Sequence, residues 1–377
     1  MNLVWYLLPL AAIAIKALSG KPINNFLIYK GVFYHTVAQV NLYDLYPSEY
    51  FDRNHYGILF SLIIAPFCFL PPILSVVLYQ GAQLLGLHLI IRKLPITMVR
   101  QNAMMLFLLV ENITHAQNSQ TNIFIAFVLL GAWVYIYSKK NASAAIFIMV
   151  GFFVKLYGIV GLGLFFFVRY KIRFIAWLLL SFIILFYLPI IITDVDFIHQ
   201  SYIDWWTELK DKNISNIDLS NIHQNLSMIG FITRCLKLET ISNLWIILPA
   251  FVLQLLPLLR WRLWQNTVFQ LHYLSSLMLF IVLFNTATES STYVIGACGV
   301  ALWWVTSVKP LITQVVLLVL GVFIFGTLST TDLVPKSLNH GFFRLYAVKA
   351  LPYFLVWVHI IKNLSLSLFD SKNLVNG

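Results

Sequence analysis

The sequence has 377 residues, of which 60% are hydrophobic, 16% aromatic and 10% charged, and its mean hydropathy is +0.83. A soluble domain cannot cover so much apolar surface, so the composition excludes that class and favours a membrane protein with helical spans. The net charge of +11 fits anionic lipid or an anionic substrate, whereas the scattering of basic residues between apolar runs argues against nucleic acid as a partner.

The first third of the chain predicts two spans and a short helix. Residues 2–18 are apolar and lack the cleavage site of a signal peptide, so we expect a retained helix. Residues 20–55 follow as a long polar segment. The apolar run 56–91 exceeds one straight span of about 20 residues. Prolines near its middle should divide it into a short half-buried helix and a span at 73–91.

Acidic residues gather at the end of the polar segment, in LYDLYPSEYFDRNHYG. Asp44, Glu49 and Asp52 lie there beside His55, interleaved with tyrosines. Acids at the edge of a bilayer cost free energy unless they face water, a partner or a substrate. Two interpretations stay open: a solvated loop with interfacial tyrosines, and the active-site loop of a membrane enzyme.

The middle spans are separated by basic turns and one polar hairpin. Residues 102–112 and 121–137 should be spans joined by the hairpin ENITHAQNSQTN. Residues 143–168 carry Lys155 at their centre, and two short helices that meet there fit this position better than one long helix. A second long polar segment is expected at 194–242, and the remaining spans at 174–193, 243–259, 267–285, 292–306, 310–328 and 343–361.

The charge of the turns predicts an orientation. The turns after residues 91, 137, 168, 259 and 306, with the C-terminal tail, hold about half of the 25 Lys and Arg residues and one of the 14 acids, Asp370. Both termini should therefore be cytoplasmic, and segments 20–55 and 194–242 external. The sequence predicts an all-α polytopic membrane protein, a single integral membrane domain over 1–377 with roughly twelve transmembrane helices. External loops should carry the site.

Polar side chains should converge at the external ends of the spans. The sequence contains no nucleotide loop, zinc-ligand spacing or serine-hydrolase elbow, so we predict no metal and no cofactor. Carboxylates, amides and cations around an apolar cavity suit transfer chemistry on a lipid-linked, phosphate-bearing substrate. They are the acids of the first polar segment, the stretch Glu111 to Asn122, Lys155, Asn225 with Arg234, Glu289, and His340 with Arg344. Lys155 has a simpler reading as a side chain that reaches out to the interface.

Five segments carry a family resemblance. They are NNFLIYKGVFYHTVAQVNLYDLYPSEYFDRNHYGILFSLIIAPFCFLPP, AQNSQTN, GFFVKLYGIV, QNLSMIGFITR and ATESSTYVIG, which occur in this order over residues 24–297. In the same order, they resemble five features of glycosyltransferase family 87: its opening segment, its Gly-Gln-x-Asn hairpin, its Lys-x-x-Pro segment, its Asn-Gln-Ser-x-x-Gly-x-x-x-Arg stretch and its late external loop. The members of this family are polyprenol-phosphate-mannose-dependent mannosyltransferases with a multi-span C-type architecture.

Three departures from the family pattern matter for the site. The family's first acid matches Asn24 or Asn25, whose amides cannot act as a base. The late histidine has no match, and Glu289 is the nearest ionisable residue. Gly158 stands where a proline is expected. The donor is therefore open to other polyprenyl-phosphate sugars.

The resemblance implies a membrane hexosyltransferase. It would move a hexose, mannose in the family, from a polyprenyl-phosphate sugar to a lipid-linked or glycan acceptor at the periplasmic face of a bacterial inner membrane, with inversion. The catalytic base is left to Asp52, Glu289, Glu49 or Asp44. Asp52 comes first because it lies closest to the point where the chain enters lipid, and desolvation there should raise its pKa; Glu289 comes second. Lys155, Arg234 and Arg344 are the candidate phosphate cations. The predicted substrate-binding set is Asn24, Asn25, Tyr29, His55, Tyr56, Gln120, Asn122, Lys155, Asn225, Arg234 and Arg344.

Two other classes of function fit the same composition. One is a polytopic transporter or flippase for a lipid or sugar, because polar residues also line transport pathways. The other is an acyltransferase or an enzyme like an O-antigen ligase or polymerase, which would also act on lipid-linked substrates. The long external segments, and the lack of an obvious internal repeat in the sequence, favour an enzyme over a transporter.

Overall fold

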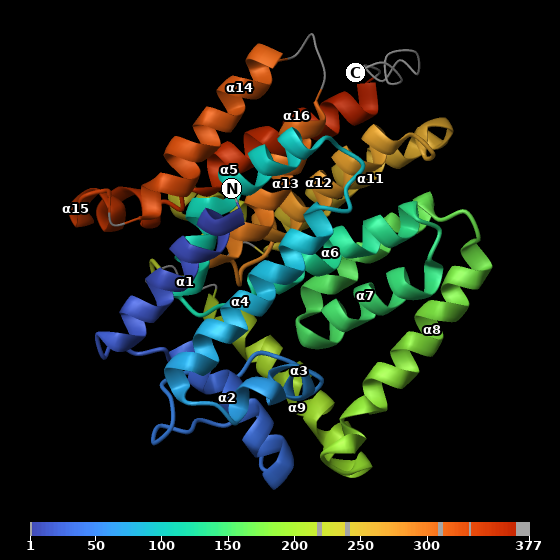
Figure 1. Cartoon of the computed structure of the whole chain (residues 1–377). Coiled ribbons are helices and arrows are strands. Elements are labelled where there is room, and N and C mark those ends of the chain that lie inside the picture. Colours follow the sequence, from blue (N-terminus) through green and yellow to red (C-terminus); the bar gives the residue numbers. More distant parts are fainter. Residues whose placement is uncertain (1, 217–220, 238–241, 308–311, 332, 367–377) are drawn as a thin grey trace. The chain divides into compact units, whose positions relative to one another are not determined.

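The computed structural model describes residues 2–216, 221–237, 242–307, 312–331 and 333–366 (Figure 1). Within these ranges every regular element is a helix. The contacts between residues divide the chain into two compact units. Unit 1 comprises Met1–Pro95 and Asn112–Asn213, and unit 2 comprises Ile96–Glu111 and Ile214–Gly377. A single membrane domain over the whole chain stays a prediction.

Unit 1 is built from helices that pack mainly on their neighbours in the chain. Helix α7 packs against both α6 and α8, and α4 packs against α1 and α6 (Figure 1). The elements are α1 (Asn2–Leu18), α2 (Asn24–Ala38), α3 (Phe60–Cys68), α4 (Pro72–Ile91), α6 (Asn122–Tyr137), α7 (Asn141–Val154), the 3-10 helix η1 (Leu156–Phe167), α8 (Lys171–Tyr187), η2 (Leu188–Ile191) and α9 (Val195–Asn216). Helix α5 (Met98–Gln117) belongs to unit 2 as far as Glu111 and to unit 1 from Asn112.

Two breaks in unit 1 are where the sequence predicts them. The apolar run after residue 56 divides into α3 and α4, and Pro72 opens α4 at a position where its missing N–H costs nothing. The run after residue 141 divides at Lys155, whose extended backbone (φ −155°, ψ 121°) separates α7 from η1. Both breaks interrupt apolar sequence, and the second places the charged side chain of Lys155 there.

Unit 2 is centred on the pair α12 and α13, with α16 packed against both. Ser227 and Asn266 cap α10 and α12 by accepting main-chain N–H bonds from Gly230 and Phe269. The elements are α10 (Met228–Leu236), α11 (Leu244–Leu255), η3 (Leu256–Leu259), η4 (Trp261–Leu263), α12 (Thr267–Leu283), η5 (Ser290–Thr292), α13 (Tyr293–Thr306), α14 (Ile312–Gly321), the π-helix η6 (Val322–Thr327), η7 (Leu328–Thr330), α15 (Lys336–Leu338), the π-helix η8 (Asn339–Arg344) and α16 (Ala350–Leu366).

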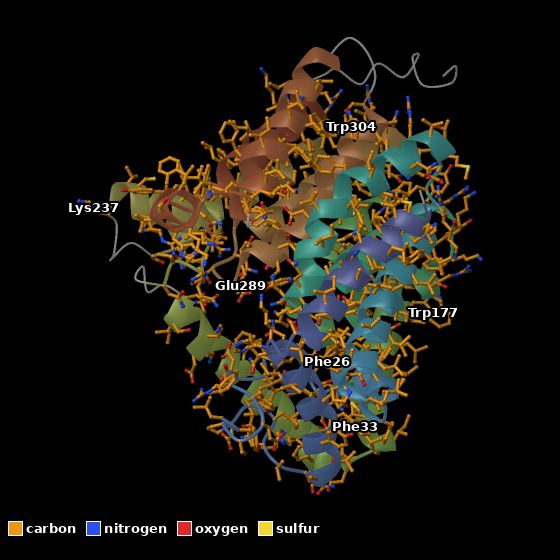
Figure 2. The ribbon with its side chains drawn as sticks, turned by 60° about the vertical axis from the view of Figure 1, so that its left-hand side comes forward. Phe26, Phe33, Trp177, Lys237, Glu289 and Trp304 are labelled. Atoms are coloured by element: carbon orange, nitrogen blue, oxygen red, sulfur yellow. The ribbon has the colours of Figure 1, made fainter. Side chains whose placement is uncertain are left out.

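Several predicted boundaries are wrong. The polar segment 194–242 is not a continuous loop, because it contains α9 and α10. The polar segment 20–55 contains α2, because NNFLIYKGVFYHTVA buries Phe26, Phe33 and other apolar residues in the core of unit 1 (Figure 2). The hairpin after residue 111 is shorter than expected, since α5 continues to Gln117. The last span begins at Ala350 rather than near residue 343, because the chain first forms η8 and then turns at Ala347 with φ of 50°.

Two helical stretches in the described part of the chain are long and apolar enough to cross a membrane, Pro72–Ile91 and Lys171–Ile191. Shorter apolar helices of 10–17 residues occur in both units. The second stretch exposes large apolar side chains along α8, among them Ile172 and Ile183. An exposed apolar strip of this length is costly in water and favourable in lipid. The chain is thus an all-helical protein with apolar spans, and roughly twelve crossings stay a prediction.

Candidate functional site

The predicted site residues fall into two groups, one in each unit. Unit 1 carries Asn24, Asn25, Tyr29, Asp44, Glu49, Asp52, His55, Tyr56, Gln120, Asn122 and Lys155, and unit 2 carries Asn225, Arg234, Glu289 and Arg344. Within each unit these residues come from several different helices and loops.

Lys155 is the centre of the group in unit 1. Its ammonium donates to Asn122 Oδ1 at 3.0 Å and lies over the rings of Tyr157 and Tyr56, at 4.5 Å and 5.7 Å from their centroids. An amide oxygen and two aromatic faces stabilise a cation without adding a formal negative charge. The break between α7 and η1 therefore places a charged group where an anionic ligand would be attracted.

An aromatic cluster lies beside this lysine. The hydroxyl groups of Tyr29 and Tyr56 are 3.1 Å apart, and Tyr29 makes edge-on contacts with Phe60 and Tyr79. Both Tyr29 and Tyr56 are buried. Fixed aromatic rings of this kind form rigid walls, and their hydroxyl groups provide hydrogen-bonding positions.

The turn between α5 and α6 carries Gln120, and Asn122 begins α6; both are predicted substrate-binding residues. The carbonyl of Gln120 accepts bonds from the side chains of Gln80 and Gln83, at 3.2 Å and 3.0 Å. His115 accepts the main-chain N–H of Ile123 at Nε2, which leaves its proton on Nδ1. The Nδ1 atom of His115 and the Nδ2 atom of Asn122 are buried and have no hydrogen-bond partner in the described part of the chain.

The two asparagines that match the family's first acid have structural contacts. Asn24 Oδ1 accepts the main-chain N–H of Phe51 at 2.8 Å, and Asn25 Nδ2 donates to the carbonyl of Asn118 at 2.8 Å. These bonds tie the start of α2 to the acidic loop and to the α5–α6 turn. Both side chains therefore position other segments, whatever they bind in addition.

The three acids of the loop before α3 differ in their surroundings. Asp44 and Asp52 are exposed, and Asp52 Oδ1 accepts the main-chain N–H of Arg53. Glu49 is half-exposed and lies 3.2 Å from Nε2 of His35, a residue on α2. The sequence argument for Asp52 as the base assumed that its carboxylate is shielded from water. The carboxylate is exposed, so this assumption does not hold.

A buried carboxylate that sequence analysis did not single out anchors the same loop. Glu208 on α9 is 5% exposed; its Oε2 lies 3.2 Å from Arg53 Nη1, and its Oε1 lies 3.1 Å from His55 Nδ1. Trp205 Nε1 also donates to the carbonyl of His55 at 3.0 Å. His55 is thus held by α9, and its predicted contact with substrate competes with this anchoring.

In unit 2, Arg234 fixes a loop rather than pointing into open space. Its guanidinium donates to the main-chain carbonyls of Asn221, Gln224 and Asn225 at 3.0, 2.9 and 3.3 Å. The loop turns tightly at Asn225, which has φ of 49°, and Gly230 lets the carbonyl of Asn225 come close. These bonds favour a positioning role for Arg234. Its neighbour Cys235 is exposed, whereas Cys68 and Cys298 are buried.

Glu289 lies in the short connection between α12 and α13 (Figure 2). It forms a reciprocal capping arrangement with Thr292, and its Oε1 accepts a bond from Gln224 Nε2 at 3.0 Å. The side chain is partly buried. Glu289 is therefore a carboxylate with a fixed direction and partial access.

Arg344 and two histidines lie close to this carboxylate. Arg344 Nη1 donates to His223 Nδ1 at 3.1 Å, and the rings of His223 and His340 meet edge to face at 5.7 Å. Burial lowers the pKa of His223, with help from Arg344 and His340, while Glu289 opposes the shift. His223 is thus neutral at pH 7 and can accept the bond from Arg344. A carboxylate, two imidazoles and a guanidinium form the second cluster.

Sequence analysis named Glu111 but missed its partner. Lys349 Nζ lies 2.9 Å from Glu111 Oε1, and both side chains are 1% exposed. Lys349 was not predicted as a site residue, because it lies within the predicted span 343–361 and no neighbouring motif marks it as a partner of Glu111. No group of three His, Cys, Asp or Glu side chains in the described ranges is placed to hold a metal ion.

Comparison with known proteins gives one positive result. The family model described as glycosyltransferase family 87 matches residues 54–286. No curated protein matches the chain. The matched range includes the end of the acidic loop, Lys155 and the Asn225–Arg234 loop, and it ends just before Glu289.

Proposed function

The chain belongs to glycosyltransferase family 87 and is therefore a glycosyltransferase, and from this premise we propose that it moves a hexose from a polyprenyl-phosphate sugar to a lipid-linked or glycan acceptor. Mannose is the first candidate for the hexose. We place the reaction at the periplasmic face of a bacterial inner membrane, with both termini in the cytoplasm. The family match carries this proposal, and the charged residues of both units support its finer steps.

The reaction needs a base for the acceptor and cations for the leaving group. A carboxylate removes the proton from the acceptor hydroxyl, whose oxygen attacks the anomeric carbon. The bond from that carbon to the phosphate oxygen breaks, and the anomeric centre inverts. Polyprenyl phosphate leaves with an additional negative charge, which cations in a water-poor site stabilise.

Glu289 is the base that the geometry favours. It is partly buried, its direction is fixed by Gln224 and Thr292, and neutral His223 lies in the same cluster. Asp52, the first candidate from sequence, is exposed. A base works best when its orientation is fixed before the acceptor arrives. We therefore propose Glu289 first and keep Asp52 as the alternative.

Two cations suit a phosphate ligand. Arg344 presents a guanidinium in the cluster of Glu289, and guanidinium groups bind phosphate in a bidentate manner. Lys155 carries its charge among Asn122, Tyr56 and Tyr157 in unit 1. We assign Arg344 to the leaving phosphate, keep Lys155 as a separate anion-binding candidate within unit 1, and assign Arg234 to the folding of its loop.

The test is sugar transfer by the purified full-length protein in detergent. We expect a synthetic short-chain polyprenyl-phosphate mannose to give inverted product with lipid extract as acceptor, and the nucleotide sugar alone to give none. Transfer from the nucleotide sugar alone would contradict the proposed donor. Sugar-lipid flux in sealed vesicles without any product would instead identify a transporter.

A further inference from the structure

The ion pair between Lys349 and Glu111 in unit 2 takes no part in the proposed reaction. Both side chains are almost completely buried, and their charged atoms are 2.9 Å apart. Removing two charges from water costs several kcal/mol per ion, so a buried pair is weak support for fold stability by itself. An ionisable pair retained in so apolar a chain calls for a role that apolar side chains cannot fill.

The same ammonium holds the turn that carries Glu289. Lys349 Nζ donates to the carbonyl of Ser290 at 3.3 Å and lies 3.4 Å from Ser290 Oγ. It also lies over the ring of Tyr293, 4.8 Å from the centroid. Ser290 follows Glu289 directly, so these contacts hold the residue next to Glu289 through its carbonyl and its hydroxyl.

The peptide on the other side is fixed as well. Leu226 donates its main-chain N–H to the carbonyl of Thr288 at 2.7 Å, and Tyr293 donates its hydroxyl to the carbonyl of Leu226 at 2.5 Å. Glu289 therefore sits between two carbonyls that each accept a defined donor. The donor to the Ser290 carbonyl is the charged side chain of Lys349, and its ion pair with Glu111 restricts the position of its ammonium.

Glu111 is in turn oriented by its own neighbour. Tyr353 on α16 donates its hydroxyl to Glu111 Oε1 at 3.4 Å. The contacts run from α16 through Glu111 to Lys349 and from there to Ser290, all within unit 2. We propose that Lys349, held by Glu111, is a positioning residue that aims the Glu289 carboxylate. This inference rests on the proposed role of Glu289 as the base.

The test compares three variants of the full-length protein. Lys349→Met removes the donor but leaves Glu111 as an unpaired buried charge, which destabilises any fold. The double variant Glu111→Gln with Lys349→Met removes that penalty and still lacks the donor to Ser290. Lys362→Met is the matched control, because Lys362 is an exposed lysine near the end of α16.

We expect the melting temperature of the double variant to lie within a few degrees of the wild-type value. Its kcat should fall about 10- to 100-fold while its KM stays within about twofold, as for a catalytic group with the wrong orientation. Amide hydrogen exchange over residues 286–292 should be faster by about tenfold in both Lys349 variants. The Lys362→Met protein should match wild type in every measurement.

Wild-type kcat and wild-type exchange over residues 286–292 in the double variant would overturn the inference. The exchange experiment needs no substrate, so it separates this inference from the proposed function. A wild-type protein that transfers no sugar from any polyprenyl-phosphate donor refutes the reaction. In that case faster exchange in the variants still supports the positioning of the turn, and unchanged exchange refutes it.

Discussion

At the scale of single residues, the candidate carboxylates differ in their surroundings. Arg53 and His55 both reach the buried Glu208, so the loop on which Asp52 lies is anchored although its own carboxylate faces solvent. Glu289 combines a fixed direction with partial access. These contacts are the reason that we propose Glu289 before Asp52 as the base.

Glu289→Gln should lower kcat about 10²- to 10⁴-fold, the usual contribution of a general base, and leave donor binding unchanged. Asp52→Asn should stay within about threefold of wild type. Steady-state transfer and binding of the donor measure both effects, with Asp211→Asn, a change at an exposed acid that is not a candidate base, as the control. An inactive Asp52→Asn enzyme beside an active Glu289→Gln enzyme would move the role to Asp52.

His223 should make unit 2 less stable in mild acid. Burial, Arg344 and His340 lower its pKa below the ordinary value, so the unfolded chain binds a proton at a higher pH than the folded protein does. The stabilisation is complete above about pH 6.5 and is lost as pH falls through that value towards the lower folded pKa.

His223→Gln should reduce the loss of melting temperature between pH 7 and pH 5 by about 1–2 °C, a small effect because the imidazole is only partly buried and water screens its interactions. Differential scanning fluorimetry in detergent measures it. His199→Gln, a change at an exposed histidine of unit 1, is the control. An unchanged pH dependence in His223→Gln would show that the Arg344 contact does not depend on protonation.

At the scale of elements, the approach of α7 and η1 depends on two glycines. A Cβ atom on Gly158 would lie 2.2 Å from the carbonyl carbon of Gly151 and 2.3 Å from the main-chain nitrogen of Phe152. Backbone cannot move aside as a flexible side chain can. The break at Lys155 therefore has its geometry set by the residues that follow it.

Gly158→Ala should destabilise the protein by about 3 kcal/mol or more, because overpacking against backbone exceeds the usual cost in a core. Gly81→Ala on α4 is the matched control, since its nearest side-chain atom would be 3.8 Å away; it should be neutral or stabilising by about 1 kcal/mol. Thermal unfolding in detergent compares them. Equal melting temperatures for the two variants would contradict this packing.

Sequence predicted these elements unevenly, for physical reasons. Proline and a central lysine interrupt helical patterns locally, so the α3–α4 and α7–η1 breaks could be predicted. Helix α2 was missed because Asn, Lys and His dilute its apolar face. The pairing of Lys349 with Glu111 could not be predicted, since it joins α5 to the turn before α16, far apart in the chain, and leaves no spacing pattern. The role of every candidate site residue stays a prediction.

At the scale of the whole molecule, the orientation is a prediction from the charge of the turns. Short turns rich in Lys and Arg should face the cytoplasm. In a Cys235→Ser background, which removes the exposed natural thiol, cysteines introduced at Lys140 and Arg262 should react only with a permeant reagent in intact cells, and one at Asp52 also with an impermeant reagent. A cysteine at Asp218, which lies outside the described residues, should behave like the one at Asp52. Labelling of all four from the same side would refute the orientation and the periplasmic reaction.

The exposed thiol of Cys235 gives the natural protein a chemical reporter. The other two cysteines, Cys68 and Cys298, are buried, so a bulky alkylating reagent should modify the folded chain at one position. That position adjoins Arg234, whose three bonds hold the loop from Asn221 to Asn225. We expect the rate of Cys235 alkylation to depend on how rigid this loop is. A substrate that makes the loop more rigid should slow the alkylation, and the measurement needs no engineered residue.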